Sequence, residues 1–261
     1  MAHMKNTIIL WLAISITAVQ GQAPKLELKK ASTHAMEYYI SLPNGWATNK
    51  KWPVVIAVEA ADKQFKQNAE RFMAARKNLP FIIVVPFNTT NGGQGHRDST
   101  IYPYTKTVWD TIDKVSICKF DMDGLQSIIK DLKANYSGSD KIFLTGFEAG
   151  THLVWAMIFQ HPELLYAAAP VAGNFRNRCL ENNIFSGDAS RVQLPIKNFT
   201  GSDDKGFGVN GTVYDQYLEA KKLAIAHGYK NISETEVVGK AHEPLPGNVL
   251  EYFYNVWKTI K

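Results

Sequence analysis

A carboxylate lies at the centre of a glycine-flanked turn at residues 146–150, which read GFEAG. The turn follows an apolar segment at 141–145 and leads directly into a mostly apolar segment at 149–160, so the pattern predicts a strand, a tight turn and a helix. Glycines suit both flanks because neighbouring backbone crowds so tight a turn. The central side chain, Glu148, is presented at the start of a helix, where negative charge is favoured. Glu148 is therefore a candidate nucleophile or binding group.

Two further chemically capable groups follow later predicted strands. Asp203 and Asp204 lie in a GSDD turn after the segment 194–200, and His242 lies in a GKAHEP loop after the next predicted strand. Because ligands bind beyond the carboxyl ends of parallel strands, we expect these side chains to share a cleft with Glu148. A nucleophile, a proton-transferring histidine and an acid that orients it are the usual groups of nucleophilic catalysis.

In its motifs and their chain order the sequence resembles the α/β-hydrolase superfamily. The resemblance is greatest to secreted bacterial esterases of the feruloyl-esterase and polyhydroxybutyrate-depolymerase type, and it extends over about residues 35–261. Five segments carry it: PVVIAV, KIFLTGFEAG, HPELLYAAAPVAG, the GSDD turn and KAHEPLP.

The resemblance implies roles for individual residues. It implies Asp204 as the catalytic acid, with Asp203 as the alternative, and His242 as the catalytic histidine. The backbone N–H groups of Ala60 and Ala149 match the donors of the oxyanion hole. The implied substrate is a small-molecule or saccharide-linked ester, and the resemblance requires neither a cofactor nor a metal ion.

Two positions depart from the pattern of these esterases. Glu148 replaces the nucleophilic serine, and Glu59-Ala60 stands where many relatives have His-Gly. A carboxylate is not activated by losing a proton to histidine as a hydroxyl is, so serine-type acyl transfer is not expected. One interpretation is an exported, esterase-like hydrolase in which Glu148 attacks as a carboxylate while His242 and Asp204 activate water. The other is a catalytically degenerate homologue that binds a small molecule or a saccharide.

Glu59, Glu148 and Asp204 admit two weaker interpretations. With His242 they could converge as oxygen and nitrogen ligands of a metal ion, although no spacing motif supports a metal site. Glu59 and Glu148 could instead be the paired carboxylates of a glycosidase. Taken alone, Glu59 is more typical of a structural group that hydrogen-bonds loop backbone.

The elements that must position these groups alternate along the chain. Short apolar segments separated by segments with helical spacing predict βαβ units and a mainly parallel sheet with helices on both faces. The predicted strands are 35–42, 53–58, 81–86, 141–145, 166–172, 194–200 and 232–238, and the predicted helices are 68–77, 121–136, 149–160, 212–227 and 246–260. Residues 87–120 are predicted to be irregular. The fold class expected is α/β, an α/β-hydrolase fold with an antiparallel N-terminal edge.

Residues 1–21 are predicted to lie outside the folded domain. The first three residues resemble a cloning scar, and a lysine, a short apolar stretch and small residues then follow, as in a secretory signal peptide. The apolar stretch is short for a membrane span. We expect residues 22–261 to form a single secreted or periplasmic domain without membrane contact once the signal is removed.

The chain contains two cysteines, Cys118 and Cys179. In an oxidising compartment such a pair predicts a disulfide, and both residues are expected on the carboxyl side of the sheet, within bonding reach. Cys118 is expected just before a helix that begins near Asp121. Two buried free thiols are the alternative.

The composition of the 261 residues, 45% hydrophobic and 20% charged, argues against a disordered, collagenous or coiled-coil chain. The 29 Lys and Arg residues exceed the 24 Asp and Glu residues, but they are scattered along the chain. Proteins that bind nucleic acids usually concentrate basic charge on one face. Nucleic acid is therefore not an expected partner.

Overall fold

The described part of the chain is built on one central sheet. The computed structural model describes residues 25–91, 97–180 and 184–260, so the predicted scar and signal peptide lie outside the described residues. The strands are β1 Leu26–Lys30, β2 Glu37–Ser41, β3 Val54–Val58, β4 Ile82–Pro86, β5 Ile142–Phe147, β6 Leu165–Val171, β7 Ile196–Gly201 and β8 Ile232–Val237. They form an eight-stranded sheet in the order β1-β2-β4-β3-β5-β6-β7-β8.

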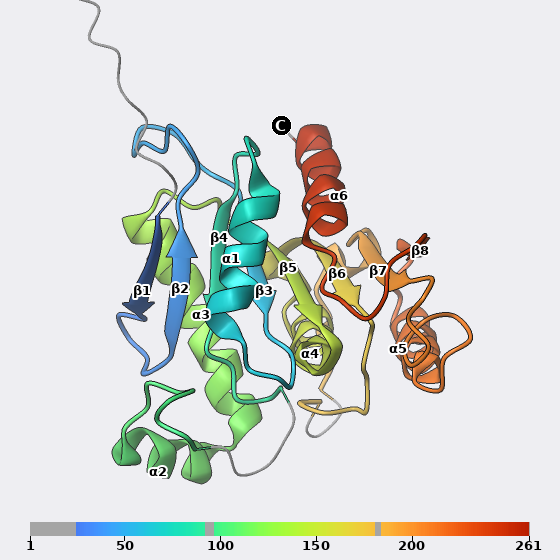
Figure 1. Ribbon diagram of the computed structural model, residues 1–261, viewed down its shortest axis with the longest axis horizontal. Coiled ribbons are helices and arrows are strands. Elements are labelled where there is room, and N and C mark those ends of the chain that lie inside the picture. Colours follow the sequence, from blue (N-terminus) through green and yellow to red (C-terminus); the bar gives the residue numbers. More distant parts are fainter. Residues whose placement is uncertain (1–24, 92–96, 181–183, 261) are drawn as a thin grey trace, which may run out of the picture.

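The direction of the strands changes at one edge of the sheet. β1 pairs antiparallel with β2, and β2 pairs antiparallel with β4, whereas the pairs from β4 to β8 are parallel (Figure 1). The predicted fold class, a mainly parallel sheet with an antiparallel N-terminal edge, is confirmed. Parallel strands place their carboxyl ends at one edge, and the loops expected to carry the site therefore lie together.

The sequences of the strands reflect their positions in the sheet. Every residue of β3 and β4 is buried, which matches their uninterrupted apolar sequences. β8, at the opposite edge, has the sequence ISETEV and keeps its alternate glutamates exposed. An edge strand with charged side chains resists pairing with other chains.

Helices cover both faces of the sheet. They are α1 Phe65–Arg76, α2 Lys106–Val115, α3 Ile117–Asn135, α4 Thr151–Gln160, α5 Tyr214–Ala226 and α6 Pro246–Thr259, with short 3-10 turns η1 Glu148–Gly150, η2 Pro162–Leu164 and η4 Ala189–Val192. α1 packs on β4 and against α6, while α4 packs on β5 and β6 and against α3 (Figure 1).

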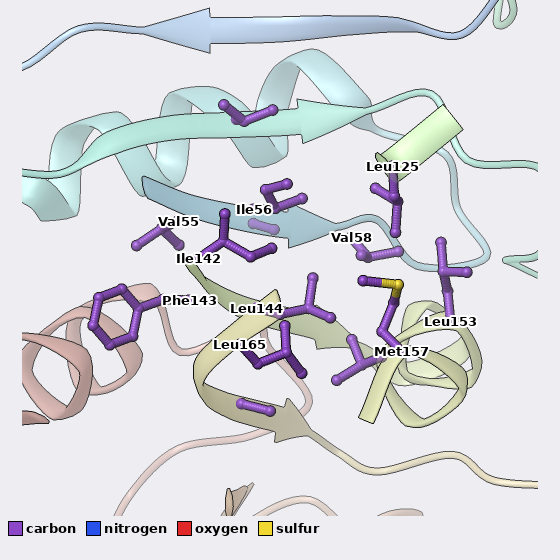
Figure 2. Packing of buried hydrophobic residues seen from close by; sticks show 14 of the residues in the cluster. Val55, Ile56, Val58, Leu125, Ile142, Phe143, Leu144, Leu153, Met157 and Leu165 are labelled. Atoms are coloured by element: carbon purple, nitrogen blue, oxygen red, sulfur yellow. The ribbon is translucent and has the colours of Figure 1, made fainter. Parts of the chain in front are cut away.

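The core beneath the site is closely packed. Figure 2 shows side chains from β3 and β5, including Val58 and Leu144, beside Leu153 and Met157 from α4. All four side chains are at most 1% exposed. The end of β5 and the start of α4, which flank Glu148, are thus anchored by apolar packing.

The region predicted to be irregular, residues 87–120, contains α2 and the start of α3, so that prediction is wrong there. In α2 only Ile112 is fully buried, but Val108, Trp109 and Val115 also pack against the core and form an apolar face with helical spacing. Local interactions add to this packing: the Thr105 hydroxyl accepts a hydrogen bond from the Val108 N–H, and Lys106 pairs with Asp110 one turn on.

The predicted disulfide between Cys118 and Cys179 is present, with Cα atoms 5.1 Å apart. Cys118 lies in the first turn of α3 rather than before it, because Ser116 caps the helix earlier than expected. Cys179 lies in the loop that follows β6, so the bond ties α3 to that loop. Within the described ranges, no helix has the length and apolar character needed to cross a bilayer.

We predict that replacing both cysteines by serine lowers the free energy of unfolding by about 4 kcal/mol. The bond closes a loop with a sequence separation of 61, and the restricted entropy of the unfolded chain accounts for this magnitude. Urea unfolding of the oxidised protein and of the double variant measures the difference. A reductant should destabilise the native protein only, and equal stability of the two oxidised proteins would contradict the prediction.

Candidate functional site

Glu148 lies in a strained turn between β5 and α4. Its φ is +47°, in the left-handed region that non-glycine residues seldom adopt. Such a conformation costs of the order of 1–3 kcal/mol and persists only where the surroundings fix it. The predicted strand, turn and helix are all observed, and Glu148 is presented where the strand ends.

The glycines of the turn are required by close packing. A Cβ at Gly150 would lie 2.6 Å from the carbonyl oxygen of Glu59, at the end of β3. A Cβ at Gly146 would lie 2.7 Å from the side chain of Val154. Both distances are shorter than real Cβ contacts, so only glycine lets the turn sit against the loop after β3.

This close approach brings Glu148 to the backbone of the loop after β3. The Ala61 N–H donates a hydrogen bond to Oε2 of Glu148, with a donor–acceptor distance of 3.2 Å. The loop is itself held by the buried Asn88, whose side chain bonds both the N–H and the carbonyl of Glu59 at 3.3 Å. The turn at residues 146–150 is the elbow, and the N–H that contacts its carboxylate, that of Ala61, is therefore one residue beyond Ala60.

Asp204 and His242 form a direct pair. Nδ1 of His242 lies 2.7 Å from Oδ2 of Asp204. The other oxygen of Asp204 accepts hydrogen bonds from the N–H groups of Gly206 and Phe207, at 3.1 and 2.9 Å. The carboxylate is 3% exposed and the imidazole 40%. A buried carboxylate with both oxygens bonded thus fixes the orientation of a histidine whose side chain remains partly exposed.

The loops that carry this pair are joined by backbone contacts. β7 and β8 are parallel neighbours, so the turn after β7 lies beside the loop after β8. The Asp203 N–H donates to the carbonyl of Lys240 at 2.8 Å, and a Cβ at Gly201 would lie 2.1 Å from that same oxygen. The side chain of Asp203 instead accepts a bond from the exposed Ser202 hydroxyl, so Asp204 is the acid that contacts the histidine.

Two phenylalanines hold the imidazole of His242. Phe207 stacks on the ring, with centroids 4.6 Å apart, and Phe147 packs at 4.7 Å. Phe147 directly precedes Glu148, so this contact places the histidine beside the elbow. Neither phenylalanine was predicted as a site residue, although Phe207 stands in a GFG sequence that begins two residues after the predicted acid.

The carboxyl group of Glu59 has partners of its own. Burial, together with the neighbouring Asp62 carboxylate, raises the pKa of Glu59 to about 8, against hydrogen bonds from the N–H groups of Ala60 and Gln64. Glu59 is thus largely protonated at neutral pH and serves the structure of the loop, as its sequence context suggested. The oxyanion-hole roles of Ala60 and Ala149 stay predictions.

The structure therefore brings Glu148, the Asp204–His242 pair and the loop after β3 to one edge of the sheet. Among the residues with described positions, no group of three or more His, Cys, Asp or Glu side chains is arranged to hold a metal ion. The chemistry available is that of a carboxylate bound by a backbone N–H next to an acid-oriented histidine.

Comparison with known proteins identifies similar structures but no close relative. No family model and no curated protein sequence matches the chain. A thermostable esterase structure is 17% identical with a TM-score of 0.54; the match covers 91% of this chain and 62% of that one. An S-formylglutathione hydrolase from Agrobacterium tumefaciens is 12% identical, with a TM-score of 0.53 and coverage of 91% and 95%.

A feruloyl esterase module from Clostridium thermocellum, in complex with sinapinate, is also similar. It is 16% identical with a TM-score of 0.52, over 92% of this chain and 88% of that one. Identities this low establish the fold only. Together with the strand order and the elbow between β5 and α4, the comparisons show that the chain has the α/β-hydrolase fold.

Proposed function

We propose that this protein is an exported hydrolase in which Glu148 is a carboxylate nucleophile and the Asp204–His242 pair activates water. One observation carries the proposal: an acid-oriented histidine lies beside an elbow carboxylate that has one oxygen on a backbone N–H. The fold is shared with esterases and other hydrolases, which supports hydrolysis as the class of reaction.

In the first step, Oε1 of Glu148 attacks an electrophilic carbon of the substrate. The new bond is an ester when that carbon is an alkyl carbon, as in a halide or an epoxide, and a mixed anhydride when it is the acyl carbon of an activated ester; the leaving group departs with its electron pair. Oε2 keeps its contact with the Ala61 N–H and becomes the carbonyl oxygen of the covalent intermediate on Glu148. The positive φ of Glu148 directs the carboxylate out of the turn for this attack.

In the second step, Nε2 of His242 takes a proton from water, and the oxygen of that water adds to Cδ, the carboxyl carbon of Glu148. The negative charge develops on Oε2, where the Ala61 N–H stabilises it, and the predicted Ala149 N–H would assist. The bond between Cδ and Oε1 of Glu148 then breaks. The product leaves with Oε1 and takes the proton back from His242, while water oxygen remains in the carboxyl group.

The chemistry of the nucleophile limits the substrate. A carboxylate is a weak base, so it does not readily expel the strongly basic alkoxide of an ordinary alkyl ester. Carbon that bears a good leaving group, as in an activated ester, a halide or a strained epoxide, suits it better.

Export rests on the N-terminal sequence, and the disulfide is compatible with an oxidising compartment.

We predict that His242→Gln accumulates a covalent adduct on Glu148, an ester from benzyl chloride or styrene oxide and a mixed anhydride from para-nitrophenyl acetate. The substitution removes the base that activates water but leaves the carboxylate and the Ala61 N–H in place. Mass spectrometry after exposure to benzyl chloride, styrene oxide or para-nitrophenyl acetate should show an adduct on the peptide containing Glu148. Glu148→Gln is the control and should show none; the absence of both adduct and turnover across the three probes would exclude the mechanism.

A single turnover of benzyl chloride or styrene oxide in heavy-oxygen water should label the enzyme before the product. The mechanism transfers Oε1 to the first product molecule and leaves water oxygen in the carboxyl group of Glu148. With enzyme in excess, the product should therefore be unlabelled and the Glu148 peptide heavier. Label in the first product would mean that water attacks the substrate directly.

A second function is favoured by one observation. The Glu148 carboxylate already occupies the N–H of Ala61, a donor that would otherwise be free for an oxyanion. A protein that has lost catalysis could use this fixed carboxylate to bind a small molecule or a saccharide through its cationic or hydroxyl groups.

Glu148→Ser distinguishes the two functions. If the protein is a degenerate esterase, para-nitrophenyl acetate hydrolysis should appear in the serine variant at least about tenfold above wild type, since the acid–histidine pair is already formed. If Glu148 is the nucleophile, wild type should hydrolyse at least one probe that Glu148→Gln does not. Rates of the three proteins, measured side by side, decide between them.

A further inference from the structure

The loop after β4 places a buried amide side chain against the loop after β3. The two strands are parallel neighbours, and their pairing joins residues 54–56 to residues 82–84 (Figure 1). Beyond this ladder, Oδ1 of Asn88 accepts a hydrogen bond from the Glu59 N–H, and the side-chain nitrogen of Asn88 donates one to the Glu59 carbonyl, both at 3.3 Å. A side-chain amide has the donor and acceptor of a peptide group, so Asn88 continues the ladder by two bonds.

Other segments of the chain hold Asn88 in place. The hydroxyl of Tyr102, between β4 and α2, donates a hydrogen bond to the Asn88 carbonyl at 2.9 Å. The N–H groups of Thr89 and Thr90 both donate to Oδ2 of Asp121, on α3, at 2.7 Å. Asn88 and Asp121 are fully buried. An irregular loop whose backbone groups are bonded by buried side chains has little freedom to move, so Asn88 is a fixed reference point for the loop after β3.

Both partners of the hydrogen bond between Ala61 and Glu148 depend on the position of Glu59. Ala61 follows Glu59 by two residues, and the elbow meets the Glu59 carbonyl at Gly150, where a Cβ would lie 2.6 Å from the oxygen. The distance from the Ala61 nitrogen to Oε2 of Glu148 is 3.2 Å. This is the long end of the usual range, so a small shift of Glu59 is enough to break the bond.

We propose that Asn88 is a positioning residue, which holds the Ala61 N–H on the carboxylate of Glu148. The inference rests on the proposed function and adds to it a residue that acts through the backbone of Glu59. In the second step negative charge develops on Oε2, and a donor that is already in place stabilises it without reorganisation. Misplacing a catalytic group by about 1 Å slows a reaction by up to about a hundredfold, so the clamp by Asn88 matters for the rate.

The first test follows the amide proton of Ala61 by NMR and needs no turnover. A bond to a carboxylate moves an amide proton downfield, so Glu148→Ala should move the Ala61 resonance upfield and thereby identify the signal of this bond. Asn88→Leu removes both bonds to Glu59 at similar side-chain volume. It should also move the resonance upfield and speed the exchange of this proton with solvent at least about tenfold.

Ser139→Ala is the matched control for a general loss of stability. It removes a hydroxyl that bonds the Lys141 carbonyl at 2.8 Å, just before β5 and away from the elbow. The Ala61 resonance should not move in this variant. An unchanged resonance in Asn88→Leu, or equal changes in Asn88→Leu and Ser139→Ala, would contradict the proposal.

A second variant keeps the test decisive if Asn88→Leu does not fold. Tyr102→Phe keeps the ring and removes the hydroxyl that holds the Asn88 carbonyl. It should move the Ala61 resonance in the same direction and speed exchange at least about threefold. If Ala61 does not respond to Tyr102→Phe in that case, the proposal is wrong.

The second test separates the two chemical steps. With benzyl chloride, Asn88→Leu should slow hydrolysis of the Glu148 adduct at least about tenfold, because charge develops on Oε2 in that step. Formation of the adduct should slow by less than about threefold, since it places no new charge on Oε2. Mass spectrometry of samples quenched over time measures both rates. Equal slowing of both steps would indicate general loosening of the site and contradict the proposal.

The two tests also distinguish failure of this inference from failure of the proposed function. A shifted Ala61 resonance in Asn88→Leu, in a protein that forms no adduct on Glu148, would retain the positioning role and reject the nucleophile. An adduct on Glu148 that Asn88→Leu hydrolyses as fast as wild type would retain the nucleophile and reject the role of Asn88.

Discussion

The site depends on the contact between Gly150 and the end of β3. A Cβ at Gly150 would meet the carbonyl oxygens of Glu59 and Val58 at 2.6 and 2.7 Å, so the elbow reaches this position only because residue 150 lacks a side chain. From that contact follow the bond from the Ala61 N–H to Glu148 and the clamping of Glu59 by Asn88. The left-handed conformation of Glu148 costs conformational free energy, and the apolar packing of β5 and α4 around the turn offsets that cost.

Replacing a hydroxyl by a carboxylate at such a turn changes what the neighbouring donors do. In a serine enzyme the oxyanion donors remain free until the substrate carbonyl arrives. Here the Ala61 N–H already bonds an oxygen of the enzyme. The Ala61 N–H can therefore stabilise a developing negative charge only if the carbonyl group under attack is that of Glu148 itself. A covalent ester on Glu148 satisfies that condition, whereas direct attack of water on a bound ester does not.

The sequence predicted those features that depend on local pattern. Uninterrupted apolar strands, the glycines around Glu148 and the order of elbow, acid and histidine were sufficient for the sheet apart from β1, and for expecting Asp204 and His242 to lie together. α2 was not predicted, although Val108, Ile112 and Val115 have helical spacing and pack against the core. The contacts of Ala61 and Phe147 were missed because they join segments far apart in the chain.

The distribution of charge explains how several acidic groups coexist at this edge of the sheet. The carboxyl oxygens of Asp204 are bonded by two backbone N–H groups and by His242. Glu59 instead avoids charge, because burial and Asp62 raise its pKa to about 8. Glu148 is then the acidic group that combines partial exposure with a single N–H donor.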